Sequence, residues 1–342
     1  MTDADHDFSS LGEWAQALVR ASSGGGWNSR LTRAPAGAGE TIATLGGFLV
    51  PEGFADRIFG SLYEDRTSIL SYFQQFNIPE GTNSLSVPGA DETSRANGYR
   101  WGGVIADFAD EGIAATPTFP KLRATQFAAE KMIGFCYLSD EILADTVNLE
   151  AFLMRAFGDE LRYNLERYTV GSAGTGAGNP LSILNSPALV TAPKVTGQTA
   201  GTLNGQNMRT MCSYLPAASR KRAIWALSES AIDALDANDE ISFAQSGATY
   251  PDDLPRIKGR PAIVTDVLPA LGTKGDVLLI DPAWYGFASK PSVSALSAHV
   301  SFTNDQTVFR LSWRVDGKPL ISAPVTGTDG VSRSPYVNLA TR

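Results

Sequence analysis

The residues that most often perform catalysis or bind metals are few and widely separated in this sequence. Of its two histidines, His6 lies in an acidic N-terminal segment and His299 lies in a segment expected to be a strand. An isolated histidine cannot build a zinc site, which takes three or four protein ligands. No serine sits in a GxSxG turn, so a hydrolytic triad has no recognisable nucleophile. We therefore expect no catalytic residue, no metal and no cofactor, and a protein that is not an enzyme.

A glycine-rich segment at 171–178 is the one candidate for phosphate binding, because backbone N–H groups in such loops can hold phosphate. A phosphate-binding loop of the known kinds joins a strand to a helix and carries a Lys-Ser or Lys-Thr pair. This segment follows an expected helix and has no such pair. We interpret it as a helix stop followed by a turn.

Charged residues form three short clusters. The acidic pairs at 239–240 and 252–253 lie on polar loops, where adjacent carboxylates are expected to be solvated, and no sign of a shared cleft accompanies them. The basic cluster at 220–222 is too short for a nucleic-acid tract and is expected at the surface where a strand begins. For this cluster an inter-subunit or DNA-facing role stays open.

The overall charge disfavours binding to nucleic acid by the whole surface. The chain has 342 residues, with 28 Lys and Arg against 36 Asp and Glu, and a net charge of −8. Such a chain gains little affinity for a phosphate backbone from counterion release. The apolar runs are too short to span a membrane. Cys136 and Cys212, far apart in sequence, are expected to be reduced and buried.

Hydrophobic periodicity predicts several elements. A short amphipathic helix is expected at 9–22, and a second helix follows Pro51. The strongest helix signal begins after Asn148 and ends at Gly171. Its apolar residues recur at helical spacing: Leu149, Phe152, Leu153, Ala156, Phe157, Leu161, Leu165 and Tyr168.

Alternation predicts strands, which together with the helices indicate an α+β fold. Residues 123–137 are expected to form one strand, with Phe127, Ala129, Lys131, Ile133, Phe135 and Tyr137 on the same side. Residues 307–315 alternate in the same way. The Asp-Gly pair at 316–317 is expected to form a two-residue hairpin turn.

Two segments are expected to leave the globular body. The N-terminal arm lacks periodicity, and residues 79–121 are rich in Gly and Pro, which is best explained by a long β-hairpin that packs on another molecule. Neither segment can bury its aromatic residues by itself. We therefore expect a lattice of identical copies, with inter-subunit contacts at Trp27, Phe48, Tyr99, Arg100, Trp101 and Phe108. Deletion of residues 82–116 should leave soluble monomers or loose capsomers.

Several motifs, in order along residues 45–340, resemble the Hong Kong 97-type major capsid proteins of tailed bacteriophages. LGGFLVP (45–51) before a helix is similar to the start of the mature region in that family. The long helix running into GTGAGNPLSILN (174–185) resembles its spine helix and following turn. The C-terminal half is similar through Gly259-Arg-Pro, GDVLLID (275–281), Tyr285 and FTNDQTVFRLSWRVDG (302–317).

The resemblance implies a Hong Kong 97-type capsid fold with an N-arm, an E-loop, a peripheral P-domain that carries a long spine helix, and an axial A-domain. The boundaries that it implies follow the chain: a short N-terminal amphipathic helix and linker (1–26), the N-arm (27–50), a helix and strand leading to the E-loop (51–78), the E-loop (79–121), the P-domain (122–200) with its spine helix at 148–171, the A-domain (201–287), P-domain strands (288–317), and a return to the A-domain (318–342).

The function implied is that of a major head protein that self-assembles into hexamers and pentamers of an icosahedral shell. Such a shell encloses double-stranded DNA without sequence-specific binding, contacts a portal protein and has no membrane. It is assembled in the host bacterial cytoplasm and forms the virion capsid. About forty residues precede Gly46, so scaffolding is expected either from a separate protein or from the 9–22 helix in a reduced role, and decoration proteins are possible partners. The E-loop region 80–120 has no lysine, so no covalent crosslinking is expected.

Two alternatives stay open. An encapsulin-like bacterial nanocompartment shell would share the fold but enclose a cargo enzyme in place of DNA. An unrecognised enzyme is the third hypothesis, and turnover that is lost on replacing His299 would support it.

Overall fold

The computed structural model describes residues 17, 47–49, 68–79, 81–95, 100–106, 108, 119–139, 146–236, 254–301 and 306–342. The helix expected after Pro51 and both acidic pairs lie outside these ranges. Of the helix expected at 9–22, only Ala17 is described, and it is helical and buried. The chain divides into two units, the first formed by Met1–Glu64, Lys131–Arg162 and Lys290–Arg314 and the second by Asp65–Glu130, Tyr163–Ser289 and Val315–Arg342.

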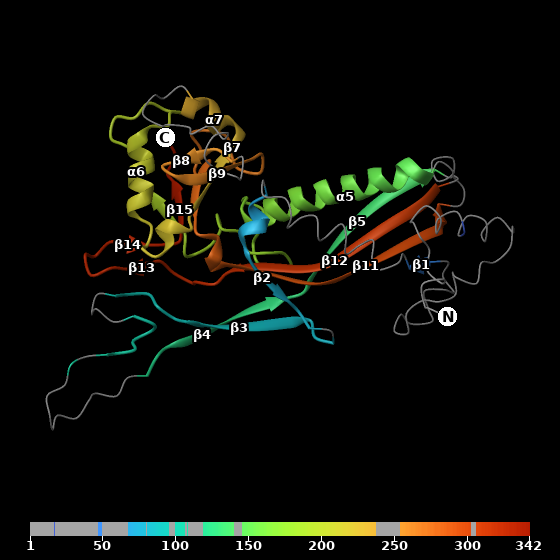
Figure 1. Ribbon diagram of the computed structural model, residues 1–342, viewed down its shortest axis with the longest axis horizontal. Coiled ribbons are helices and arrows are strands. Elements are labelled where there is room, and N and C mark those ends of the chain that lie inside the picture. Colours follow the sequence, from blue (N-terminus) through green and yellow to red (C-terminus); the bar gives the residue numbers. More distant parts are fainter. Residues whose placement is uncertain are drawn as a thin grey trace. The chain divides into compact units, whose positions relative to one another are not determined.

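The first unit is built on a long sheet with strand order β1-β11-β12-β5. The strands are β1 (Gly47–Leu49), β5 (Glu130–Ser139), β11 (Tyr285–Ser301) and β12 (Gln306–Pro319). Helix α5 (Thr146–Thr169) runs along this sheet (Figure 1). A Cβ on Gly134 of β5 would lie 3.1 Å from the Phe157 ring of α5 and 3.3 Å from the Trp313 ring of β12. Glycine therefore lets the helix approach the sheet closely.

Helix α5 confirms the strongest helix prediction, with its bounds shifted two residues toward the N-terminus from the expected 148–171. Its 24 residues correspond to a length of about 36 Å. Phe157, Leu161 and Leu165 are buried at the expected four-residue spacing. Helical hydrogen bonding ends where the backbone N–H of Gly171 bonds the Glu166 carbonyl at 3.1 Å, and a Cβ there would lie 2.7 Å from the Arg167 carbonyl oxygen. The expected stop at glycine is thus present, and the last regular helical residue precedes it.

The second unit contains a six-stranded sheet of order β6-β15-β10-β7-β9-β8. Its strands are β6 (Val190–Ala192), β7 (Ile224–Ser228), β8 (Arg256–Ile257), β9 (Arg260–Thr265), β10 (Val277–Ile280) and β15 (Tyr336–Leu339). The pairs β7–β9 and β6–β15 are parallel, and the other pairs are antiparallel. The helices α6 (Gly205–Ser213) and α7 (Glu229–Asp236) belong to the same unit, as do the short helices η4 (Ser219–Lys221) and η5 (Pro282–Trp284).

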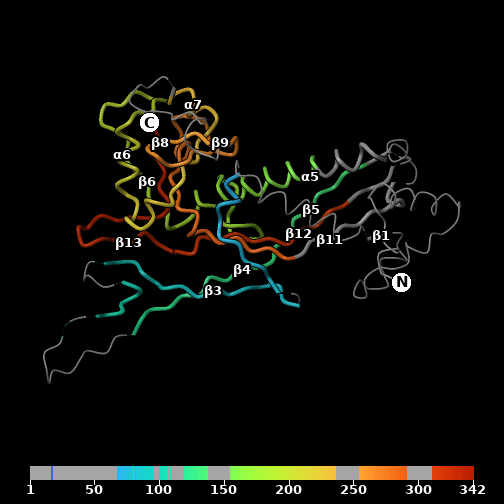
Figure 2. The backbone as a smooth tube through the Cα atoms, in the orientation of Figure 1, coloured from blue at the N-terminus to red at the C-terminus, as the bar shows by residue number. Residues whose placement is uncertain are grey.

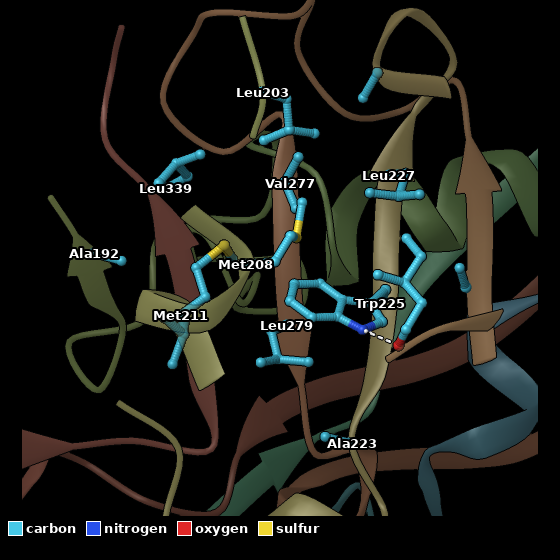
Figure 3. Packing of buried hydrophobic residues seen from close by; sticks show 14 of the residues in the cluster. Ala192, Leu203, Met208, Met211, Ala223, Trp225, Leu227, Val277, Leu279 and Leu339 are labelled. Carbon is cyan, nitrogen blue, oxygen red and sulfur yellow. Dashed lines mark hydrogen bonds between the residues drawn. The ribbon is translucent and has the colours of Figure 1, made fainter. Parts of the chain in front are cut away.

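A continuous apolar core joins this sheet to α6 and α7. Trp225 of β7 is fully buried, and its indole N–H donates to the Ile257 carbonyl at 3.1 Å (Figure 3). Met208 and Met211 of α6 belong to the same buried cluster as Trp225. Strands β7, β10 and β15 are buried at every residue, as is typical of central strands covered on both faces.

Several buried polar groups of the second unit bond to one another across the fold. The Glu166 carboxylate of α5 accepts from the Ser68 hydroxyl at 2.7 Å and from the Thr265 hydroxyl at 3.1 Å. The Arg342 guanidinium and the Asp276 carboxylate form a two-bond ion pair of 2.7 and 3.0 Å in which neither side chain is exposed. These bonds link segments that are far apart in the sequence.

The remaining elements of the second unit lie outside the six-stranded sheet. The short helix η3 (Ile69–Tyr72) leads to β2 (Gln74–Asn77), which pairs in parallel with the start of β11. Strands β3 (Ser84–Ala90) and β4 (Leu122–Ala128) form an antiparallel pair, and so do β13 (Val325–Thr326) and β14 (Ser332–Arg333).

The single strand expected over 123–137 is wrong: the structure has two strands, β4 and β5, with Ala129 between them. The residues that were expected on one side differ in burial. Phe127 and Ala129 are buried, whereas Ile133, Phe135 and Tyr137 are exposed. The reason is that α5 covers the opposite face of β5, the face that carries Gly134.

The hairpin turn expected at 316–317 is also wrong, because β12 continues through both residues. The Asp316 carboxylate accepts from the backbone N–H of Ala128 at 2.8 Å and from the Lys318 ammonium at 2.9 Å, which holds this segment extended. Burial raises the pKa of Asp316, and these two donors oppose the shift. Gly317 is required for close packing, since a Cβ there would lie 2.7 Å from the Tyr285 hydroxyl.

The two cysteines are free thiols, as expected, but they are half-buried where full burial was expected. Burial raises the pKa of both thiols, which disfavours the reactive thiolate.

Candidate assembly surface

The β3–β4 hairpin (residues 84–128) has a firmly paired base. Its register runs from Ser84 opposite Ala128 to Ala90 opposite Leu122. Leu85 and Val87 of β3 pack against a buried cluster that includes Phe127. The base of the hairpin is therefore part of the second unit's core.

Beyond the base, residues 91–95 and 100–106 continue from β3, and residues 119–121 lead into β4 (Figure 2). The backbone N–H of Asp91 donates to the Lys121 carbonyl at 2.9 Å. One arm then pairs with β13, since the Arg95 N–H donates to the Thr326 carbonyl at 2.7 Å and the Thr326 N–H donates to the Thr93 carbonyl at 3.1 Å. These bonds fix the direction in which this arm leaves the base.

A tight turn at 100–104 presents Trp101 to solvent. The N–H groups of Gly103 and Val104 both donate to the Arg100 carbonyl, at 3.2 and 3.1 Å. Trp101 adopts a left-handed backbone conformation with φ of 58°, which is rare for a bulky residue. Its side chain is 68% exposed. The surrounding bonds thus hold an aromatic residue outward in a conformation that costs energy.

Other large apolar side chains on the hairpin are exposed as well: Val104, Phe108, Phe119 and Leu122. A group of exposed apolar residues of this size marks an interaction surface. Its polar neighbours include the exposed Arg100 and Lys121. Trp and Arg are the residues most enriched among those that dominate binding energy at protein interfaces.

Three of the six residues predicted at inter-subunit contacts are therefore described and exposed: Arg100, Trp101 and Phe108. Phe48 lies in β1, opposite Leu296 of β11. Trp27 and Tyr99 lie outside the described residues. Their roles in contacts between subunits remain predictions.

A second exposed apolar group was not predicted. Ile133, Phe135 and Tyr137 of β5 form a stripe, with Phe135 and Tyr137 about 60% exposed. Strand β5 lies at the edge of its sheet. An exposed apolar edge strand favours association with another chain. The charged Lys131 at the start of the same stripe is the one sequence signal that this face is not a core face.

The glycine-rich segment is a closed structural turn, as predicted. The Asn179 side chain accepts from the backbone N–H groups of Thr175 at 2.8 Å and Gly176 at 3.2 Å. The Asn185 side chain donates to the carbonyls of Ser172 and Gly174, both at 2.8 Å. The N–H groups of Thr175 and Gly176 that a phosphate would need are already bonded within the turn.

Gly174 explains why this turn requires glycine, and it yields a sharp prediction. A Cβ on Gly174 would lie 2.0 Å from the Tyr168 carbonyl oxygen and 2.5 Å from the Pro180 carbonyl oxygen. We expect Gly174→Ala to lower the free energy of unfolding by about 4 kcal/mol or more, the range reached by severe overpacking and strain. Gly178→Ala is the matched control, because its Cβ would meet no atom within 4 Å and its left-handed φ of 71° adds only a local cost. Equal denaturation midpoints for the two variants would contradict this account.

The residues first considered for chemistry can be placed in the described part of the chain. No group of three His, Cys, Asp or Glu residues there could hold a metal ion. His299 lies in β11, as expected for a strand residue. The basic cluster is at η4, where Arg222 pairs with Asp281 at 2.8 Å. Within the described residues, no helix combines the length and apolar character needed to cross a bilayer.

Comparison with solved structures defines the class of fold. The capsid of an empty GTA particle, computed with C5 symmetry, superposes with a TM-score of 0.59 at 16% identity, over 81% of this chain and 91% of that chain. The native GTA capsid gives the same TM-score at 14% identity and the same coverage. A chain of Microbacterium phage Oxtober96 gives a TM-score of 0.51 at 12% identity, over 79% of this chain and 90% of that chain. The α+β fold is the Hong Kong 97-type capsid fold.

The model of the phage capsid family matches residues 46–329, so the chain belongs to the phage capsid family. It is a major capsid protein of the tailed-bacteriophage type, and a structural protein of the virion. The matches give no support to the nanocompartment alternative over a phage capsid. No protein with a curated description matches the chain significantly.

Proposed function

We propose that copies of this chain form the hexamers and pentamers of an icosahedral shell that encloses double-stranded DNA, and that the β3–β4 hairpin of each copy packs on a neighbour. The observation that carries the proposal is the exposed apolar surface of the hairpin, where Trp101 is 68% exposed and Phe119 is 88% exposed. The related GTA capsids were computed with C5 symmetry, which is the symmetry of a pentamer.

We assign the functional segments as the fold suggests. The hairpin with its connection serves as the E-loop (79–121), and residues 27–50 serve as the N-arm. The P-domain comprises 122–200 and 288–317 and contains α5 as its spine helix, while the A-domain comprises 201–287 and 318–342. The unit boundaries at Ser289 and Val315 lie close to the limits of the second P-domain segment, 288–317, and so support that segment of the assignment. Residues 51–78 lead into the E-loop, and 1–26 form a separate N-terminal segment.

The partners of the shell follow from its task. A portal protein would occupy one vertex, and separate scaffolding and decoration proteins would act during assembly in the host cytoplasm and on the finished particle. The net charge of −8 favours a wall that holds DNA without binding it tightly, since tight binding would hinder packing and ejection.

Electron microscopy of the purified full-length protein, together with analysis of nuclease-protected contents of particles from infected or induced cells, tests the proposal. We expect closed shells built of hexamers and pentamers, with DNA inside the particles. A chain that stays monomeric under all assembly conditions would contradict the shell. Particles filled with an enzyme in place of DNA would instead establish a nanocompartment.

Trp101 is expected to be a principal anchor of the hairpin contact. Trp101→Asn removes the ring while suiting the left-handed backbone, because asparagine tolerates positive φ. Loss of a buried interface tryptophan costs about 2 to 4 kcal/mol per contact. Each contact should therefore weaken roughly 30- to 1,000-fold.

The measurement is the protein concentration at which shells form, followed by light scattering. The thermal unfolding of the dissociated variant serves as the control for folding and should match that of the original chain. Assembly of Trp101→Asn at an unchanged concentration would show that the ring is not an anchor.

A further inference from the structure

Positive charge gathers at one end of the six-stranded sheet. Helix η4 immediately precedes β7, and the Lys258-Gly259 turn immediately precedes β9. Because β7 and β9 are parallel, with Trp225 opposite Ala262, these two segments lie at the same end of the sheet. We call this the basic end, defined by Arg220, Lys221, Lys258 and Arg260.

Three of the four cations of the basic end lie close to the Cys212 sulfur. The Arg260 guanidinium donates to the Arg220 carbonyl at 3.0 Å and lies 3.6 Å from the Cys212 sulfur. Burial raises the pKa of the Cys212 thiol, while Arg260, Lys258 and Arg220 oppose the shift, as cations near the same sulfur must. The basic end is thus a single cluster from three elements.

These cations have no acid to neutralise them within the described part of the chain. Arg222 is satisfied by the buried Asp281, but Arg220, Lys221 and Lys258 are exposed and form no ion pair there. In a chain of net charge −8, such a group is exceptional. It is a surface that suits an anionic partner.

Lys258 has a backbone conformation that is unfavourable for lysine. Lys258 has φ of 50° and Gly259 has φ of 75°, the pattern of a primed two-residue hairpin turn between β8 and β9. Asn-Gly is the preferred sequence for such a turn, and lysine is disfavoured at positive φ. Asparagine at 258 would therefore suit the backbone better but would lack the charge.

The opposite end of the same strands carries negative charge. Helix α7 begins directly after β7, and its Glu229 and Asp233 are exposed one turn apart. Asp266 follows the last residue of β9 and is also exposed. We call this the acidic end, defined by Glu229, Asp233 and Asp266. Lys274 lies near it and reduces but does not reverse its charge.

The two ends cannot neutralise each other within one chain. Strand β7 separates them by five residues, which corresponds to about 16 Å. Coulomb attraction in water over that distance is largely screened at physiological salt. The ends can meet closely only when the basic end of one copy faces the acidic end of another. Contacts of this head-to-tail kind join different surfaces and form a ring when the rotation between neighbours closes.

We propose that the six-stranded sheets of neighbouring copies associate head to tail, with the basic end of one copy against the acidic end of the next around a hexamer or pentamer. The proposal rests on the proposed shell function and names the charge pairs within its rings. Complementary charges of this kind set partner orientation and encounter rate. Ring formation should therefore weaken as salt is raised.

Charge reversal and charge swapping test the pairing. The variant Arg220→Glu with Lys258→Glu should need at least about tenfold more protein to form capsomers, because it reduces the net charge of the basic end from four positive charges to zero and places two glutamates opposite the acidic end. Adding Glu229→Arg and Asp233→Arg to the same chain places two arginines opposite the two introduced glutamates and should restore assembly. Native mass spectrometry and electron microscopy measure the rings, and thermal unfolding of the monomers shows that each variant folds.

Lys258→Asn is the matched single variant, because it removes one charge from a turn that asparagine suits. It should leave the monomer as stable as before, or more so, and should reduce the salt dependence of ring formation. Unchanged assembly of the double reversal would overturn the pairing while leaving the shell intact. Folded four-residue variants that fail to recover assembly would overturn it too. If shells of the double variant form normally but retain less DNA, the basic end faces nucleic acid instead of a neighbouring copy. If the original chain itself fails to assemble, the proposed shell function is contradicted.

Discussion

A variant without the distal part of the β3–β4 hairpin is expected to fold but to form no closed shells. The variant lacks residues 92–120 and joins Asp91 to Lys121 through an Asn-Gly turn. This design follows the register, in which Ala90 lies opposite Leu122 and Asp91 bonds Lys121. Asn-Gly is the preferred two-residue connection for such a hairpin. The variant loses Trp101 and Phe108, and with them the surface that we assign to contacts between copies.

The structure changes the deletion that the sequence alone would recommend. Removing 82–116 would also remove β3, and with it Leu85 and Val87, which pack on the buried cluster around Phe127. Loss of assembly could then reflect a damaged core. The shorter deletion keeps β3 paired with β4.

Sedimentation velocity and electron microscopy give the readout. We expect monomers or loose capsomers whose thermal unfolding matches that of the undeleted chain. Normal shells from the shortened chain would reject the hairpin as an assembly element. A lowered unfolding temperature would instead show that the arm paired with Thr326 stabilises the body of the protein.

The second large effect is expected at the buried ion pair between Asp276 and Arg342. Replacing Arg342 with Met should lower the free energy of unfolding by about 3 to 5 kcal/mol, because it leaves a carboxylate buried without its partner. Within the described residues, the Asp276 carboxylate then keeps one donor, the backbone N–H of Gly272 at 2.9 Å. The lost guanidinium also donates to the Thr202 carbonyl.

A double-mutant cycle separates the pair from the packing around it. Asp276→Leu combined with Arg342→Met removes both charges and should recover much of the loss, since a buried pair is often replaceable by apolar residues. Arg333→Met is the control, because its ion pair with Asp329 is at the surface and should leave the unfolding temperature nearly unchanged. Additive effects of the two single substitutions would contradict coupling across the pair.

Local sequence patterns predicted where helices and strands occur more reliably than they predicted what packs against them. The apolar spacing of Phe157, Leu161 and Leu165 identifies α5, because a helix needs one continuous apolar face whatever covers it. The outward position of Arg100, Trp101 and Phe108 was also predictable, since a segment so rich in Gly and Pro cannot build a core for its own aromatic residues.

Only the tertiary structure decided which face of an element is covered. Alternation placed Phe127 and Tyr137 on one side, yet the first is buried and the second exposed. Phe127 belongs to a buried cluster of the second unit, whereas in the first unit α5 packs on the Gly134 face of β5 and leaves the Tyr137 face open. Likewise, Asp-Gly is a turn signal by local preference, and it was overridden at 316–317 by a buried carboxylate with two donors and by the close approach of Tyr285. The charge at the two ends of the six-stranded sheet is the same kind of property. Arg220 and Lys258 are far apart in sequence and lie at the same end of the sheet because β7 and β9 pair in parallel. The period of a sequence specifies which residues share a side of an element. What covers that side depends on contacts between distant segments, which only the folded chain fixes.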